Sequence, residues 1–145
     1  MSRGDRGLVR ASEMAEQKAE KALQRVASSQ QVVADMEQRL IQLKQFHTDY
    51  TCTADPTTLG NMQAILNRRN FIRRIEEAII YQRDLLEKTR HEHRCVEQAW
   101  RNERAQAKVL DRVCERHSDE ARWASERTEQ AMLDELSLRK PRMTE

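Results

Sequence analysis

The sequence contains few of the residues that allow a chain to change direction. Only three of its 145 residues are Gly and two are Pro, and aromatic residues make up 4%. Gly and Pro are the strongest local breaks in a chain, so it has few places to reverse direction. The remainder is rich in Ala, Glu, Lys, Arg, Gln and Leu, and 34% of it is charged. This composition is typical of a coiled coil, and it predicts one elongated domain without a globular core.

Other absences limit the function. No run of about 18 apolar residues occurs and the N-terminal stretch has no apolar signal core, so we expect neither membrane insertion nor a Sec-type signal. The 26 basic and 24 acidic residues are interspersed, which argues against nucleic acid as a partner. Three widely spaced cysteines favour a reducing cytosol. The positions of the three glycines permit no phosphate-binding loop, and we predict no catalytic residues and no cofactor.

Apolar residues at alternating steps of three and four form a narrow seam in each half of the chain, which fits a partner helix. In the second half the seam begins at Ile65 and continues past Trp100 through Cys114 to Ala124. In the first half it runs from Ser12 to Tyr50, with Ala and Ser at its start. The residues expected to form the coiled-coil core are Val26, Val33, Met36, Leu40, Ile72, Ile79, Leu86 and Trp100.

Pro56 and Gly60 mark the one plausible reversal point, with Asp55, Thr58 or Asn61 as candidate caps of the helix that follows. The fold class predicted is all-α, a long two-helix antiparallel coiled-coil hairpin with unequal arms. The segments expected are a flexible tail at 1–7, a helix at 8–51, a loop at 52–61, a second helix at 62–138 and a flexible tail at 139–145.

Folding the chain at this loop predicts a register. Leu43 would face Ile75, Met36 would face Gln82 and Val33 would face Leu86. Trp100 would then lie against the small residues Ala15, Ala19 and Ala22, and Leu8 near Leu110. The last part of the second helix has no partner in this register, and it is either a frayed tail or a binding arm.

The sequence HEHRC suggests metal ligands at first sight. Residues two apart point to nearly opposite sides of a helix, so only His91 and Cys95 share a face and His93 does not. Cys114 and His117 share a face without a third group to orient a base. We predict no metal site and no nucleophilic pair, and expect His91, His93 and Cys95 to be solvated helix positions.

A second apolar stripe lies beside the core seam in the loop half of both helices. A two-helix hairpin cannot bury both stripes fully, so Phe46, Tyr50 and Phe71 either form a docking face or widen the core near the turn. A basic cluster, Arg68, Arg69, Arg73 and Arg74, flanks Phe71, and a solvated charged face is its usual explanation. The whole candidate docking set is Arg39, Leu43, Phe46, Tyr50, Phe71, Ile75, Ala78 and Gln82.

The order of these motifs resembles the FliJ family of the bacterial flagellar type III export apparatus. The motifs are L-x-x-L-x-x-F-x-x-x-Y from Leu40 to Tyr50, N-F-I-x-x-I-x-x-A-I-x-x-Q from Asn70 to Gln82, then Trp100-Arg101 and the terminal L-D-E-L-S-L-R-K-P. The likeness covers residues from about 36 to 141. Phe46 stands where the family commonly has Tyr.

This resemblance implies a hairpin similar to the central stalk of rotary ATP synthases. The terminal ends, 105–138 with 8–22, would enter the pore of the hexameric export ATPase, FliI, and promote its assembly and activity. The docking set would contact the cytoplasmic domain of the export gate protein FlhA, and export chaperones would also bind. The expected location is cytoplasmic, peripheral at the inner membrane beneath the flagellum.

Two alternatives stay open. One is the equivalent stalk of a virulence injectisome, with the same physics and different cargo. The other is a homo-oligomeric coiled-coil scaffold without an ATPase partner, which would form a stable oligomer where the stalk would be monomeric.

Overall fold

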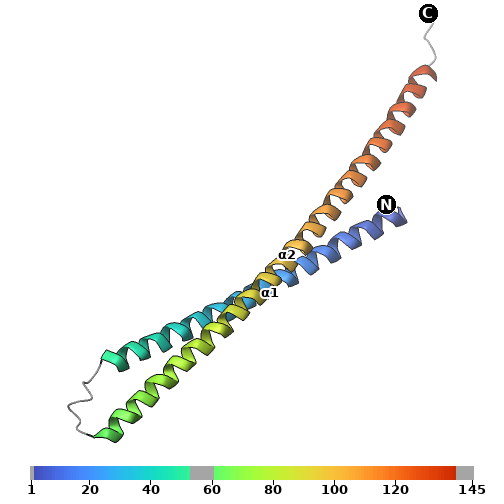
Figure 1. Cartoon of the computed structure of the whole chain (residues 1–145). Coiled ribbons are helices and arrows are strands. Elements are labelled where there is room, and N and C mark those ends of the chain that lie inside the picture. The colour runs from blue at the N-terminus through green and yellow to red at the C-terminus, as the bar shows by residue number, and fades with distance from the viewer. Residues whose placement is uncertain (1, 53–60, 140–145) are drawn as a thin grey trace, which may run out of the picture. The chain divides into compact units, whose positions relative to one another are not determined.

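Two long helices make up the computed structural model, which describes residues 2–52 and 61–139 (Figure 1). Helix α1 spans Arg3–Cys52, 50 residues, and helix α2 spans Met62–Arg139, 78 residues. The helices pack against each other as a hairpin. The predicted all-helical hairpin with unequal arms is therefore confirmed.

Helix α1 begins at Arg3, earlier than the start predicted at Leu8. The cause is a capping box, in which the backbone N–H of Asp5 donates to Ser2 Oγ (3.2 Å) and that of Ser2 donates to Asp5 Oδ2 (2.9 Å). These reciprocal bonds satisfy backbone donors that a helix start would otherwise leave free. Their effect outweighs the helix-weakening Gly4 and Gly7, on which the prediction of a tail rested.

The junction between the helices is described only at its two edges. The predicted break at Pro56 and Gly60, with the candidate caps Asp55 and Thr58, lies outside the described residues. The third candidate, Asn61, caps α2, because its Oδ1 accepts the N–H of Gln63 at 3.1 Å and its carbonyl accepts that of Ile65 at 3.2 Å.

Packing divides the described residues into two units, which we describe separately. The first consists of Lys21–Arg101, and its core is the apolar cluster Val33, Leu40, Ile75, Ile79 and Leu86, with Met36 and Leu43 packed against it. Burying a Leu or Ile side chain of this kind contributes about 1.5 to 3 kcal/mol. Among the other predicted core residues, Val26, Ile72 and Trp100 are half-buried.

The second unit combines the described residues of 1–20 with those of 102–145. Its seam is narrow and partly polar, with Ser12 and Ala107 buried and Leu110 half-buried. Ser12 Oγ donates to Asp111 Oδ1 at 3.4 Å, and the Cys114 thiol donates to the Leu8 carbonyl at 3.5 Å. The predicted grouping of the whole chain into a single elongated domain stays a prediction.

The register differs from the predicted one by one to two helical turns. Leu8 contacts Cys114, where the prediction placed it near Leu110. In the unit 21–101, Met36 Sδ lies 3.1 Å from Thr89 Oγ1, where the prediction set it opposite Gln82. A seam with alternating steps of three and four buries nearly the same side chains after a slip of one or two turns, so its pattern leaves the register open.

Candidate functional site

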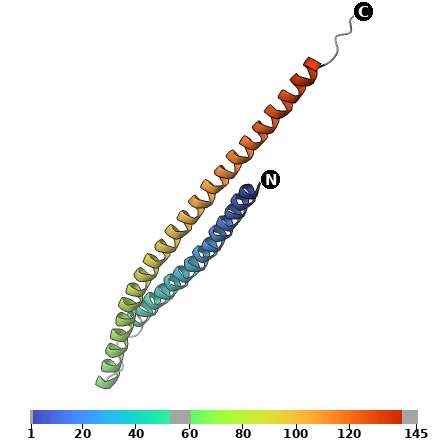
Figure 2. The same cartoon turned by 90° about the vertical axis from the view of Figure 1, so that its right-hand side faces the viewer.

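The C-terminal part of α2 has no partner helix among the described residues. Every residue from 115 to 139 is exposed, and Cys114 is the last half-buried one. Within this unit α2 continues beyond the start of α1 (Figure 2). An isolated helix of this length is marginal in water, so a binding partner would stabilise it considerably. The large apolar side chains it exposes are Trp123 (63%), Met132 (61%), Leu133 (60%), Leu136 (61%) and Leu138 (87%).

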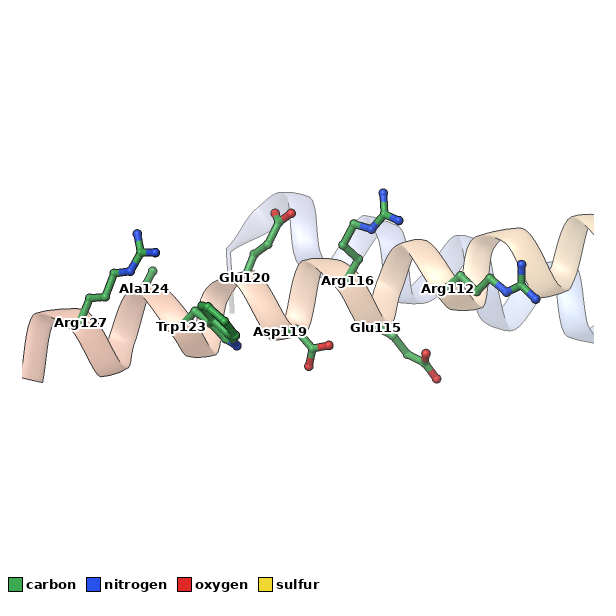
Figure 3. Close-up of a pocket in the computed structure, with 8 residues that line it drawn as sticks. All are labelled: Arg112, Glu115, Arg116, Asp119, Glu120, Trp123, Ala124 and Arg127. Atoms are coloured by element: carbon green, nitrogen blue, oxygen red, sulfur yellow. The ribbon is translucent and has the colours of Figure 1, made fainter.

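Trp123 lies in a shallow hollow along this exposed segment (Figure 3). The hollow has a volume of about 610 Å³. Arg116 and Glu120 point to one side of the helix, and Glu115 and Asp119 point to the other side. A large, rigid indole among charges of both signs is a favourable anchor for a protein partner. The lining residues are Arg112, Glu115, Arg116, Asp119, Glu120, Trp123, Ala124 and Arg127.

A second hollow, of about 580 Å³, lies between the start of α1 and the facing part of α2. Asp5 and His117 line this hollow, and Asp5 Oδ1 lies 2.7 Å from His117 Nδ1. The pKa of Asp5 is held below its usual value, first by hydrogen bonds from the Ser2 backbone and hydroxyl and then by the nearby imidazole of His117. Sequence analysis missed the contact of Asp5 with His117. It also missed the capping bonds between Ser2 and Asp5, although their S-x-x-D spacing is a recognisable capping signal.

The loop-side surface of the unit 21–101 carries an aromatic pair. The rings of Tyr50 and Phe71 have centroids 4.5 Å apart with planes inclined by 38°. Both remain substantially exposed, at 41% and 44%, and Phe46 is 59% exposed. Nearby, the Arg68 guanidinium donates to the Tyr50 carbonyl near the end of α1. These three aromatic residues therefore offer accessible apolar area next to the core.

The other members of the candidate docking set lie in different environments. Ile75 is buried in the core cluster at 9% exposure and Leu43 packs against it, so neither is a free surface residue. Arg39 is exposed, and Ala78 and Gln82 are half-buried. The Gln82 Nε2 atom is buried and has no hydrogen-bond partner among the described residues. Some residues of the stripe are therefore exposed and available to a partner, whereas others, such as Ile75 and Leu43, belong to the core of the hairpin.

The histidines and cysteines are dispersed. His91 Nε2 lies 3.9 Å from Cys95 Sγ, while His93 faces α1 and its Nδ1 lies 3.0 Å from Ser29 Oγ. Within residues 2–52 and 61–139, no cluster of three or more His, Cys, Asp or Glu side chains has the arrangement of a metal site. In the same ranges, neither helix has a stretch apolar enough to cross a membrane.

The fold and its surfaces define a helical hairpin protein that offers exposed side chains at two places for partners. A sequence model of the family described as flagellar FliJ protein matches residues 8–144, and the chain belongs to this family. Members are non-catalytic components of the flagellar export apparatus. Comparison with curated proteins and with solved structures gave no match.

Proposed function

We propose that the chain is the stalk and escort protein of the flagellar export apparatus. Its C-terminal helix enters the ring of the export ATPase and promotes assembly and activity of that ring. Its loop-side surface contacts the cytoplasmic domain of the export gate, and the protein also binds export chaperones at the cytoplasmic face of the inner membrane. The flagellar family match favours this function over the injectisome stalk.

The observation that carries the proposal is the exposed helix at residues 115–139. It contains seven acidic residues and four arginines, two of which form local ion pairs, Arg122 with Asp119 and Arg139 with Glu135. Mixed charges on an exposed helix favour many weak contacts, and such contacts permit movement within the pore. Trp123 is the largest apolar side chain that this segment exposes.

The loop-side surface supports the second contact. Tyr50 and Phe71 present a paired aromatic patch, and interface energy is commonly concentrated in such side chains. Phe46 extends the patch on α1. We include Arg39, Ala78 and Gln82 as its flank and leave Ile75 and Leu43 to the core, where they hold the two helices together.

Binding assays with a chain ending at Cys114 test the two contacts separately. This cut keeps the contacts of Ser12 with Asp111 and of Leu8 with Cys114. We expect it to lose affinity for the purified export ATPase and to retain affinity for the gate domain. Retained ATPase affinity would contradict the assignment of the C-terminal helix.

A single substitution gives a sharper version of the same test. Trp123→Ala should weaken ATPase binding, whereas Tyr81→Ala should not, although Tyr81 is an aromatic residue of α2 with similar exposure, 68% against 63%. Equal losses in the two variants would show that the ring does not recognise the Trp123 surface. A stable oligomer of the full chain that binds no ATPase would favour the scaffold alternative.

A further inference from the structure

The first turns of α2 carry a concentration of positive charge that the proposed function does not use. Residues 62–75 contain four arginines and no acidic residue. Arg68 is engaged with the Tyr50 carbonyl. Arg69, Arg73 and Arg74 are exposed, and none of them forms an ion pair or hydrogen bond with another described residue.

The nearest carboxylates form no direct ion pair with Arg69, Arg73 or Arg74 among the described residues. Glu76 lies 3.1 Å from His47 across the hairpin, and Glu77 begins the next turn of α2. On α1, Asp49 already has an interaction of its own. Like charges at neighbouring helix positions repel one another, so the three free guanidinium groups do not help the helix to fold.

Exposed apolar side chains share a face with Arg69 and Arg73, and Arg74 lies beside this face. Met62, Leu66, Arg69 and Arg73 follow one another at steps of four, three and four, which places them in one row along the helix. Met62 is 71% exposed and Leu66 46%. This row is separate from the core side, where Ile75 is buried, and from Phe71, whose ring meets Tyr50.

We propose that Met62, Leu66, Arg69, Arg73 and Arg74 form a contact surface for anionic phospholipid. Guanidinium groups bind the phosphates of lipid headgroups, and the two apolar side chains enter the boundary between headgroups and acyl chains. The exposed guanidinium groups favour a partner rich in negative charge, and the exposed side chains of Met62 and Leu66 favour an apolar layer beneath that charge. A lipid surface provides both, which favours it over an acidic protein patch.

This contact goes beyond the proposed function and does not depend on the ATPase. Basic side chains near an anionic leaflet each contribute to binding, and their contribution weakens with salt because the surface potential is screened. The contact is consequently reversible. It would hold the loop-side part of the unit 21–101 at a membrane surface.

Flotation of the full chain with vesicles tests the proposal. Vesicles of phosphatidylcholine containing phosphatidylglycerol are compared with vesicles of phosphatidylcholine alone. Replacing Arg69, Arg73 and Arg74 together by Gln should lower the partition coefficient on the order of a hundredfold. The matched control replaces Arg83, Arg94 and Arg101 by Gln, because these arginines are exposed on α2 in the same unit and the net charge changes equally.

Circular dichroism of each variant establishes that its helices are intact. Replacing the same three arginines by Lys should preserve vesicle binding, because a lipid surface requires charge, whereas a partner that demands bidentate guanidinium contacts would lose it. Three results would overturn the proposal: no preference for anionic vesicles, undiminished binding by the Gln variant, or an equal loss in the control.

Discussion

The Tyr50 ring contacts the Phe71 ring across the hairpin, with centroids 4.5 Å apart, and both rings remain more than two-fifths exposed. An aromatic pair of this kind is worth about 0.5 to 1.5 kcal/mol beyond its buried area. The exposure of both rings leaves most of their apolar area available to a partner. Phe71 therefore links hairpin stability at the loop side to the proposed gate contact.

We expect Phe71→Ala to lower the free energy of unfolding only modestly, by about 1 to 2 kcal/mol, and to reduce affinity for the gate domain by at least tenfold. Calorimetric titration with the purified gate domain measures the affinity, and urea unfolding measures the stability. The same substitution at Tyr81, which is exposed outside the aromatic patch, is the control. Full gate affinity in Phe71→Ala would assign the pair to hairpin stability alone.

Leu86 should be among the residues whose truncation is most costly, because it is the least exposed member of the core cluster, at 4%. Leu86→Ala should lower the free energy of unfolding by about 2 to 5 kcal/mol. Ile80 is 59% exposed on the same helix, and Ile80→Ala should change it by less than about 0.5 kcal/mol. Urea unfolding followed by circular dichroism compares the two, and similar losses would contradict the observed core.

Gln82 offers a test that separates packing from recognition. Its buried Nε2 lacks a hydrogen-bond partner among the described residues, and a buried unpaired donor costs about 1 to 3 kcal/mol. Gln82→Leu should therefore raise the free energy of unfolding by about 1 kcal/mol. If Gln82 also contacts the gate, gate affinity should fall in the same variant, and a gain in stability with unchanged affinity would remove Gln82 from the proposed docking surface.

The start of α1 should depend on pH through Asp5, whose pKa is lowered in the folded chain. A lowered pKa means that the folded state favours the carboxylate, so its stabilising effect is complete above the usual pKa of about 4 and is lost as the pH falls below it through the lowered value. Amide exchange near Arg6 should accelerate relative to the core over that range. Asp5→Asn should remove this dependence, and an unchanged profile in the variant would exclude Asp5 as its source.

The sequence predicted burial along the seam well, because apolar residues at steps of three and four necessarily lie on one face of a helix. All positions of the α1 seam from Ser12 to His47 are buried or half-buried, whereas its last position, Tyr50, is exposed. On α2 the seam stays at least half-buried as far as Cys114. Ala121 and Ala124 continue the pattern and are exposed, since α1 has already begun opposite His117. Periodicity identifies the face of a helix, but it does not show where the partner helix ends.

Two other features could not be predicted from the pattern. Phe71 and Ile75 share the same three-four step, and only the three-dimensional packing separates the exposed ring from the buried side chain. The register was predicted by folding the chain at Pro56 and Gly60, and the identity of these two residues does not fix which residues of the two helices face each other. Leu8 consequently contacts Cys114, which lies one helical turn beyond the predicted neighbour Leu110, although nearly the same residues are buried.

The most direct test of the stalk function is the ATPase rate of the purified export ATPase at increasing ratios of this protein. The full chain should raise the rate, and the chain ending at Cys114 should not, because residues 115–139 are the exposed helix that we propose enters the ring. Trp123→Ala should give an intermediate rate and Tyr81→Ala the full one. Equal stimulation by the truncated chain, or no stimulation by the full chain at any ratio, would contradict the stalk function.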